Sequence, residues 1–138
     1  MGSGSSFDRL LEDNFLLADG ATGTNLFLKC LLTGNAPEVW NLWQPGKIFE
    51  LHIDFLEARF KLILTNSFGG SRCRLKLYNS KKNVREINFI ASETAKECAD
   101  KFEETKLFAG PVGPTGELFE PLGLLTYISC SWDFSWAN

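Results

Sequence analysis

The residues best suited to binding a small molecule follow three short apolar runs of the chain. The first run ends in Asp19 and Gly20, the second leads into Thr65 and Asn66, and the third leads into a turn at 112–115. A carboxylate accepts charge-assisted hydrogen bonds, hydroxyl and amide groups bind polar ligand atoms, and glycine lets a ligand approach the backbone. These residue types predict a site for a small polar ligand.

The same turns also suit a purely structural role. Glycine and small polar residues form tight connections between strands and helices in many folds. One such turn does not separate the two roles, but three turns that follow successive apolar runs favour a shared binding site.

Other motifs with catalytic or cofactor chemistry do not fit this sequence. The stretch GATGTN at 20–25 lacks the glycine spacing of a dinucleotide-binding turn, and GPVGPTG at 110–116 lacks the Lys-Ser/Thr ending of a phosphate-binding loop. The single histidine, His52, lies between Ile48 and Leu56 in a helical pattern, so we expect a partly covered structural side chain. We therefore assign no catalytic residue.

The hydrophobic pattern predicts an α/β fold. Apolar runs at 15–19, 62–68 and 106–112 have the length and composition of buried strands. Apolar residues spaced three and four apart predict amphipathic helices over 47–60 and 81–104. Strands that alternate with helices pair in parallel, and right-handed crossovers place the carboxyl ends of all three strands at one edge. Parallel α/β sheets bind ligands at this edge.

The composition is that of one globular domain. The chain has 138 residues, 44% of them hydrophobic, and a net charge of −3 with scattered Lys and Arg, which argues against nucleic acid or an anionic membrane as partner. The sequence has neither a signal-peptide pattern nor an apolar stretch of membrane-spanning length, so we expect a cytoplasmic protein. The cysteines at 30, 73, 98 and 130 are too widely spaced for a zinc ribbon or a disulfide framework, and we expect them reduced and mostly buried.

Five segments of the sequence resemble the homocysteine S-methyltransferase family. They are DGATGTNLF at 19–27, APEVWNL at 36–42, LTNSFGGSRCRLKL at 64–77, the pair Glu86 and Asn88, and AGPVGPTGELFEPLG at 109–123. The resemblance is closest to the bacterial betaine-homocysteine methyltransferases and to the homocysteine-binding module of cobalamin-dependent methionine synthase. It covers residues 7–127.

This resemblance implies a zinc-dependent methyltransferase built on a TIM (β/α)8 barrel. Such an enzyme transfers a methyl group from betaine or a similar donor to L-homocysteine and gives methionine. Zinc suits this chemistry because a metal keeps the substrate thiol as the nucleophilic thiolate. In the family, cysteine thiolates hold the zinc, but none of the four cysteines here falls at a matching position. We therefore assign no metal ligand and expect no cofactor for this chain alone.

The resemblance also implies roles for individual residues. The homocysteine site would comprise Asp19, Gly20, Thr65, Asn66 and Phe68. Within it, the Asp19 carboxylate would accept hydrogen bonds from the substrate ammonium. The loop on the methyl-donor side would comprise Val112, Gly113, Pro114 and Thr115.

Two residues depart from the family pattern. Arg59 stands at the end of the first long helix, where the family usually has glycine, and Pro111 replaces what is more often serine. A non-glycine residue in a left-handed helix cap costs on the order of 1 kcal/mol. Both departures are compatible with the fold.

The resemblance and the length together imply about three βα units from the N-terminal part of a truncated barrel, because a complete barrel needs about 250 residues. We expect a flexible N-terminus with a short helix at 1–14, a partial homocysteine-binding domain at 15–127 and an atypical tail at 128–138. Uncovered strand edges and apolar faces favour association. We thus expect a marginally stable chain, inactive alone, that self-associates or binds a complementing C-terminal half. A non-catalytic homocysteine-binding remnant and a small open α/β binding domain are the alternatives.

Overall fold

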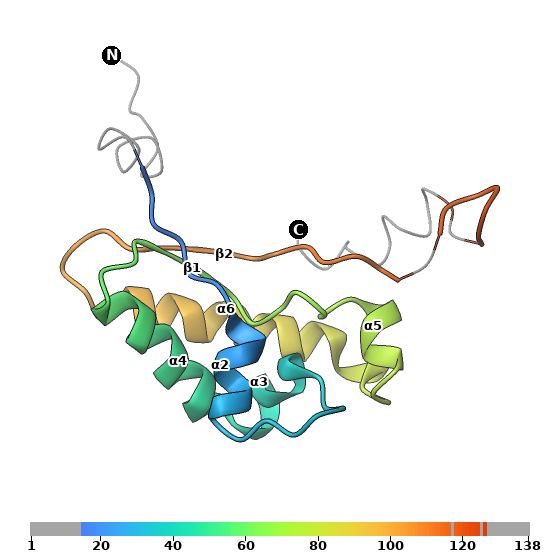
Figure 1. Cartoon of the computed structure of the whole chain (residues 1–138), viewed down its shortest axis with the longest axis horizontal. Coiled ribbons are helices and arrows are strands. Elements are labelled where there is room, and N and C mark those ends of the chain that lie inside the picture. Colours follow the sequence, from blue (N-terminus) through green and yellow to red (C-terminus); the bar gives the residue numbers. More distant parts are fainter. Residues whose placement is uncertain (1–14, 117, 125, 127–138) are drawn as a thin grey trace, which may run out of the picture.

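The computed structural model describes residues 15–116, 118–124 and 126. The predicted helix within 1–14 and the predicted tail at 128–138 lie outside these residues. In chain order the elements are α2 (Thr22–Leu28), the 3-10 turn η1 (Pro37–Val39), α3 (Trp40–Trp43), α4 (Pro45–Glu57), β1 (Leu62–Leu64), α5 (Arg72–Lys76), the 3-10 turn η2 (Lys81–Asn83), α6 (Val84–Ala99) and β2 (Leu107–Ala109) (Figure 1).

The strands pair in parallel, as the sequence predicts. Leu62 of β1 pairs with Leu107 of β2, and Ala18 from the first apolar run forms a parallel bridge with Leu62 on the other side. β1 therefore lies between the first run and β2, and the three carboxyl ends meet at one edge. The prediction of a full strand at 15–19 is too long, because only this bridge is formed before the chain turns at Gly20 into α2.

Helix α4 begins at Pro45 and ends at Glu57, close to the predicted range of 47–60. Proline suits the first helical turn, where its missing N–H is not needed. At the other end Arg59 has φ of 70°, and the backbone N–H of Phe60 donates to the carbonyl of Phe55 at 3.2 Å. This is the left-handed cap that the sequence predicts at Arg59.

Helix α6 is shorter than the predicted range of 81–104. It follows the 3-10 turn η2 and ends at Ala99. Of the next residues only Phe102 packs against the core, whereas 100, 101, 103 and 104 are charged and exposed. The end of the predicted helix thus has no apolar face to bury, which explains the earlier stop.

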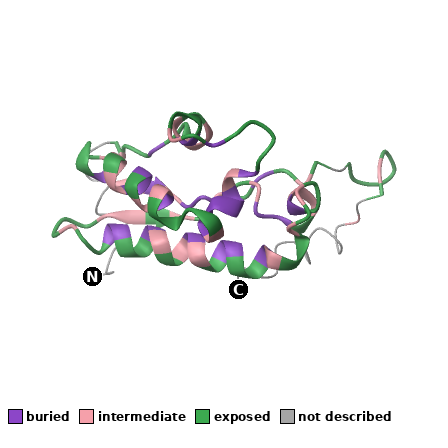
Figure 2. Ribbon diagram, turned by 90° about the horizontal axis from the view of Figure 1, so that it is seen from below, coloured by how far each residue is buried: buried purple, intermediate pink, exposed green. Residues whose placement is uncertain are grey.

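The described helices cover one face of the strands (Figure 1). Ile63 of β1 is fully buried in a cluster with Leu56 of α4 and Ala95 and Cys98 of α6. Buried residues follow the helix surfaces that are turned inward, and exposed residues follow the outer surfaces (Figure 2). Leu62 and Leu64, which flank Ile63, are only half-buried. Within the described part of the chain, no helix is long and apolar enough to cross a membrane.

Candidate functional site

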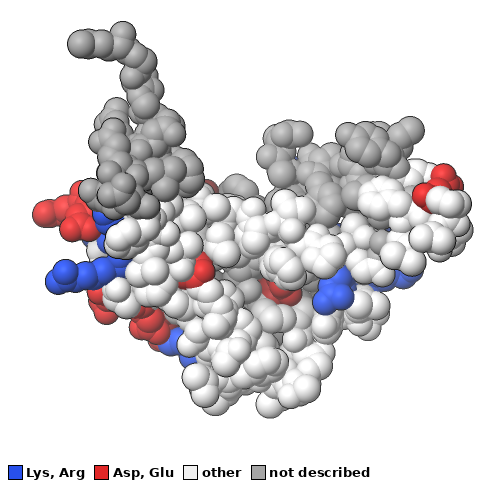
Figure 3. Space-filling view, turned by 45° about the horizontal axis from the view of Figure 1, so that its top comes forward, with Lys and Arg blue, Asp and Glu red and all other residues white. Residues whose placement is uncertain are grey.

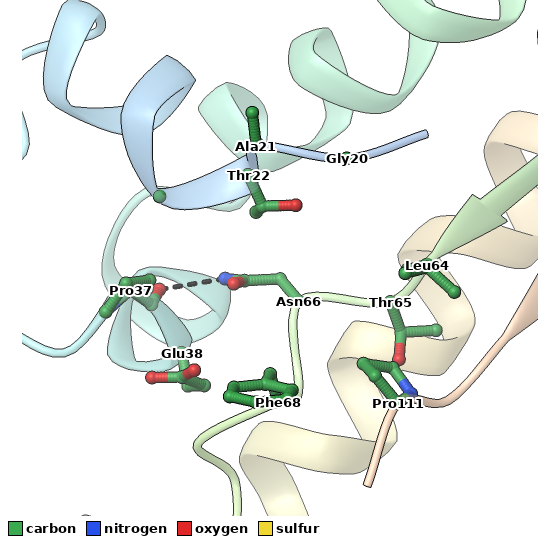
Figure 4. A pocket seen from close by; sticks show the side chains of 11 residues that line it. Gly20, Ala21, Thr22, Pro37, Glu38, Leu64, Thr65, Asn66, Phe68 and Pro111 are labelled. Carbon is green, nitrogen blue, oxygen red and sulfur yellow. Dashed lines mark hydrogen bonds between the residues drawn. The ribbon is translucent and has the colours of Figure 1, made fainter. Parts of the chain in front are cut away.

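A pocket of about 350 Å³ lies where the strands end (Figure 4). Its walls come from the turn into α2, from η1, from the segment after β1 and from the segment after β2. The lining residues are Gly20, Ala21, Thr22, Gly23, Pro37, Glu38, Leu64, Thr65, Asn66, Phe68 and Pro111. The pocket therefore brings together four of the residues that the sequence predicts for the homocysteine site, which are Gly20, Thr65, Asn66 and Phe68.

Asp19 is placed differently from its neighbour Gly20. Its side chain is only 8% exposed, and its Oδ1 accepts a hydrogen bond from the backbone N–H of Leu64 at 2.9 Å. Burial raises the pKa of this carboxyl, and the Leu64 N–H partly offsets the effect. Asp19 is not among the residues that line the pocket. Its hydrogen bond with Leu64 connects the first apolar run to the end of β1.

The predicted donor-side loop at 112–115 lies beside the pocket. Its neighbour Pro111 contributes to the wall, whereas Val112 and Pro114 are exposed. Gly113 is buried, and a Cβ atom added to it would lie 2.1 Å from the carbonyl oxygen of Phe68. Only glycine allows this close approach between the loop after β2 and the segment after β1.

Two buried amides fix the segment after β1. Asn66 donates from Nδ2 to the carbonyl of Pro37 at 2.8 Å and to Oδ1 of Asn41 at 3.0 Å. Asn41 in turn donates from Nδ2 to the carbonyls of Asn66, at 2.8 Å, and Ile87, at 3.2 Å. These bonds join η1, α3 and α6 to the pocket wall, and they satisfy amide groups that would be costly to bury alone.

Two further side chains hold the glycines at 69 and 70. Oε1 of Glu38 accepts from the backbone N–H of Gly69 at 2.7 Å, and Nδ2 of Asn88 donates to the carbonyl of Gly70 at 2.9 Å. A Cβ atom on Gly69 would meet Glu38, and one on Gly70 would meet Asn88. Glu38 is not among the site residues that the sequence predicts, although its apolar neighbours in APEVWNL are a signal of burial.

Thr65 and Ser67 form a buried hydroxyl pair. Their Oγ atoms lie 2.7 Å apart, and both side chains are almost fully buried. The backbone N–H of Thr65 donates to the carbonyl of Ala109 at 2.9 Å, which continues the pairing with β2. Thr65 thus presents a fixed hydroxyl-bearing side chain at the pocket wall.

None of the described cysteines is among the residues that line the pocket, and neither is His52. Within the described ranges, no group of three His, Cys, Asp or Glu side chains could hold a metal ion. Cys30 is exposed, while Cys98 is buried, and burial raises the pKa of its thiol to about 12. Cys130 lies outside the described residues. The described residues therefore do not bring together a set of thiolates of the kind that holds zinc.

His52 is more deeply buried than the sequence predicts. Its side chain is 1% exposed rather than partly covered, and neither ring nitrogen has a hydrogen-bond partner within the described structure. Burial lowers its pKa to about 4. The assignment as a structural histidine fits this position on α4 among Ile48, Leu51 and Leu56.

The family comparison matches residues 16–134 to the homocysteine S-methyltransferases. The chain belongs to this family. The match covers most of the chain and confirms the resemblance seen in the five sequence segments. Its range continues past Tyr127 to residue 134, into the segment predicted to be an atypical tail.

Two similar solved structures are forms of the homocysteine methyltransferase MmuM from Escherichia coli. The metallated form has a TM-score of 0.68 at 22% sequence identity, and the oxidized form has a TM-score of 0.66 at 24% identity. In each case the match covers 78% of this chain and 41% of the other chain. The α/β arrangement with parallel strands is therefore shared with part of that fold, and this chain spans less than half of its length.

Proposed function

We propose that residues 15–127 form the first part of a TIM (β/α)8 barrel whose pocket binds L-homocysteine. The observation that carries this proposal is the position of the pocket at the carboxyl ends of parallel strands, in a chain of the homocysteine S-methyltransferase family. Active sites of TIM barrels lie at this end of the strands. A pocket of about 350 Å³ is also adequate for one amino acid and part of a second small molecule.

The amino-acid end of homocysteine would lie against the turn at 19–20 and the segment after β1. In this arrangement Thr65 and Asn66 supply polar contacts and Phe68 supplies an apolar wall. Asp19 would accept a hydrogen bond from the substrate ammonium in addition to the one from Leu64, because a carboxylate accepts several hydrogen bonds. The loop comprising Val112, Gly113, Pro114 and Thr115 would approach the methyl donor, since Gly113 packs against Phe68.

The proposed reaction of the complete enzyme moves a methyl group from betaine or a related donor to the homocysteine sulfur. The carbon–sulfur bond of methionine forms as the bond between the methyl carbon and the donor breaks. Zinc in the complete enzyme would keep the sulfur deprotonated. The described residues do not provide its ligands, so we assign this chain to substrate binding and expect it to be inactive alone.

Calorimetry with L-homocysteine, with and without zinc, tests the binding role. We expect the purified 138-residue chain to bind homocysteine with an affinity that zinc does not change. An assay for methionine with betaine as donor should give no product until a polypeptide that carries the C-terminal half of a family member is added. Absence of homocysteine binding by a folded chain would overturn the proposal, and methionine formation by the chain alone would refute its inactivity.

A further inference from the structure

Among the described residues that line the pocket, Glu38 has the only ionisable side chain. The other lining residues are glycines, apolar residues, or the neutral polar residues Thr22, Thr65 and Asn66. Any ligand in the pocket therefore meets one negative charge from the walls. On the face in Figure 3 most charged side chains gather at the left side, and a few smaller acidic and basic patches lie nearer the middle.

The charge on Glu38 has no counter-ion in the described structure. The ion pairs there join Lys29 to acidic residues of α4, Lys101 to Glu97, and Lys106 to Glu104. Glu38 itself is 7% exposed, and its Oε1 accepts a hydrogen bond from the neutral N–H of Gly69. Burying a carboxylate without a cationic partner is costly, so a positively charged ligand group would relieve an existing penalty.

The carboxylate is also held in a fixed place. Its hydrogen bond to Gly69 is 2.7 Å long, and the glycine lies so close that an added Cβ would sit 2.8 Å from Oε1. Phe68, the preceding residue, is 58% exposed and places its ring next to the Glu38 side chain at the pocket wall (Figure 4). A carboxylate and an aromatic ring in one pocket wall suit a cation, since a ring face also attracts positive charge.

We infer that Glu38 and Phe68 form a subsite for a positively charged group of the ligand. This inference rests on the proposed function, because it assigns charge recognition within the same pocket. The shared chemistry is a cationic centre, which is either the ammonium group of homocysteine or the onium centre of a methyl donor. Asp19 is not one of the lining residues, so this assignment adds a second carboxylate to the one that the proposed function places at the substrate ammonium.

Matched pairs of ligands test the inference on the full chain by calorimetry. L-homocysteine is compared with 4-mercaptobutanoate, which lacks the amino group, and betaine is compared with 3,3-dimethylbutanoate, in which carbon replaces the nitrogen. We expect the cationic member to bind about tenfold or more tightly in at least one pair, as a hydrogen bond or contact to a charged group provides. The pair that shows this preference identifies the source of the cationic centre.

Glu38→Gln removes the charge and keeps an oxygen that can accept from Gly69. We expect this variant to lose the preference for the cationic member, while the exposed Glu57→Gln on α4 keeps it. Circular dichroism of each variant checks folding. The comparison of the matched ligands on the wild-type chain tests the inference even if a variant does not fold.

Three results would overturn the inference. They are equal binding of both members in both pairs, an unchanged preference in folded Glu38→Gln, and a loss of the preference in Glu57→Gln as well. Equal binding within both pairs, with homocysteine still bound, would leave the proposed homocysteine site in place and reject only the subsite. A preference for betaine without any binding of either thiol would support the subsite and reject the homocysteine proposal.

Discussion

Oδ1 of Asp19 accepts a hydrogen bond from the backbone N–H of Leu64 across 45 residues of sequence, at 2.9 Å. Asp19 follows the first apolar run, and Leu64 is the last residue of β1. This bond therefore closes the pairing between the first run and β1 at the edge where the pocket lies. The carboxylate that the sequence places in a ligand site thus also has a structural contact.

Asp19→Ala should lower the free energy of unfolding by about 1–3 kcal/mol, because the half-buried Leu64 N–H loses its acceptor. Asp19→Asn keeps an oxygen at the same place, so its free energy of unfolding should fall by clearly less. Urea unfolding of both variants beside the wild type measures the difference. Equal losses in the two variants would show that this hydrogen bond does not stabilise the sheet edge.

The proposed ligand role of Asp19 is tested by the same Asn variant. Replacing the charge should weaken binding of L-homocysteine by roughly 1.5–3 kcal/mol, the range for a hydrogen bond to a charged group. Calorimetry on the folded variant measures the change. An unchanged affinity would remove Asp19 from the proposed site and leave it a structural residue.

Arg59→Gly should raise the free energy of unfolding by about 1 kcal/mol, since glycine adopts the left-handed conformation without a Cβ clash. Arg59 has φ of 70°, its N–H donates to the carbonyl of Leu56 at 3.1 Å, and the rings of Phe55 and Phe60 pack edge to face at 5.1 Å. The cap is thus complete apart from the strained residue. Thermal or urea unfolding measures the gain, and Arg59→Ala should give none.

Gly113→Ala should destabilise the chain by about 1–3 kcal/mol, because an added methyl group in a packed interior forces neighbours apart. The new Cβ would lie 2.1 Å from the carbonyl oxygen of Phe68, so the pocket wall must also move. Urea unfolding measures the first effect and ligand affinity the second.

Gly46→Ala is the matched control for this substitution. No atom lies within 4 Å of its added Cβ, and the residue is in the first turn of α4. Alanine is favoured over glycine in helices by about 1 kcal/mol, so this variant should be as stable as the wild type or more so. Similar losses in both variants would contradict the packing argument for Gly113.

The sequence predicts the order and pairing of the main elements, because hydrophobic periodicity and the positions of glycine in the family indicate them. Parallel pairing, α4, most of α6 and the left-handed cap at Arg59 all follow from apolar spacing or family pattern. Helices α2 and α5 have seven and five residues, too few for a periodic signal. Helix α2 is also preceded by Ala21 with φ of 53°, a conformation that the sequence would favour only for glycine.

The candidate site is harder to predict because its contacts join distant segments. Asn41 and Asn66 are 25 residues apart, and each resembles an ordinary surface or turn residue until the fold pairs them. In the sequence alone, Glu38 likewise resembles an exposed acidic residue, although Val39 and Trp40 beside it are buried in the structure. Single-sequence patterns record local periodicity, whereas burial of a polar group depends on which partner the fold brings to it.

The stability of the chain should fall on acidification through His52. Burial lowers its pKa from the ordinary 6.5 to about 4, so His52 becomes protonated at a lower pH in the folded chain than in the unfolded chain. The stabilising contribution is therefore complete above pH 6.5 and is lost as the pH falls through 4. At pH 5 the loss due to this one group should be about 2 kcal/mol, from 1.36 kcal/mol per pKa unit.

His52→Leu isolates this contribution, because leucine fills a similar volume among Ile48 and Leu56 and does not titrate. Between pH 8 and pH 5 the variant should lose about 2 kcal/mol less stability than the wild type. The carboxyl groups contribute equally to both proteins and do not change this difference. The raised pKa of Asp19 acts in the opposite direction, yet it cancels in this difference. Urea unfolding at both pH values measures this difference. Parallel pH profiles of the two proteins would show that folding does not lower the pKa of His52.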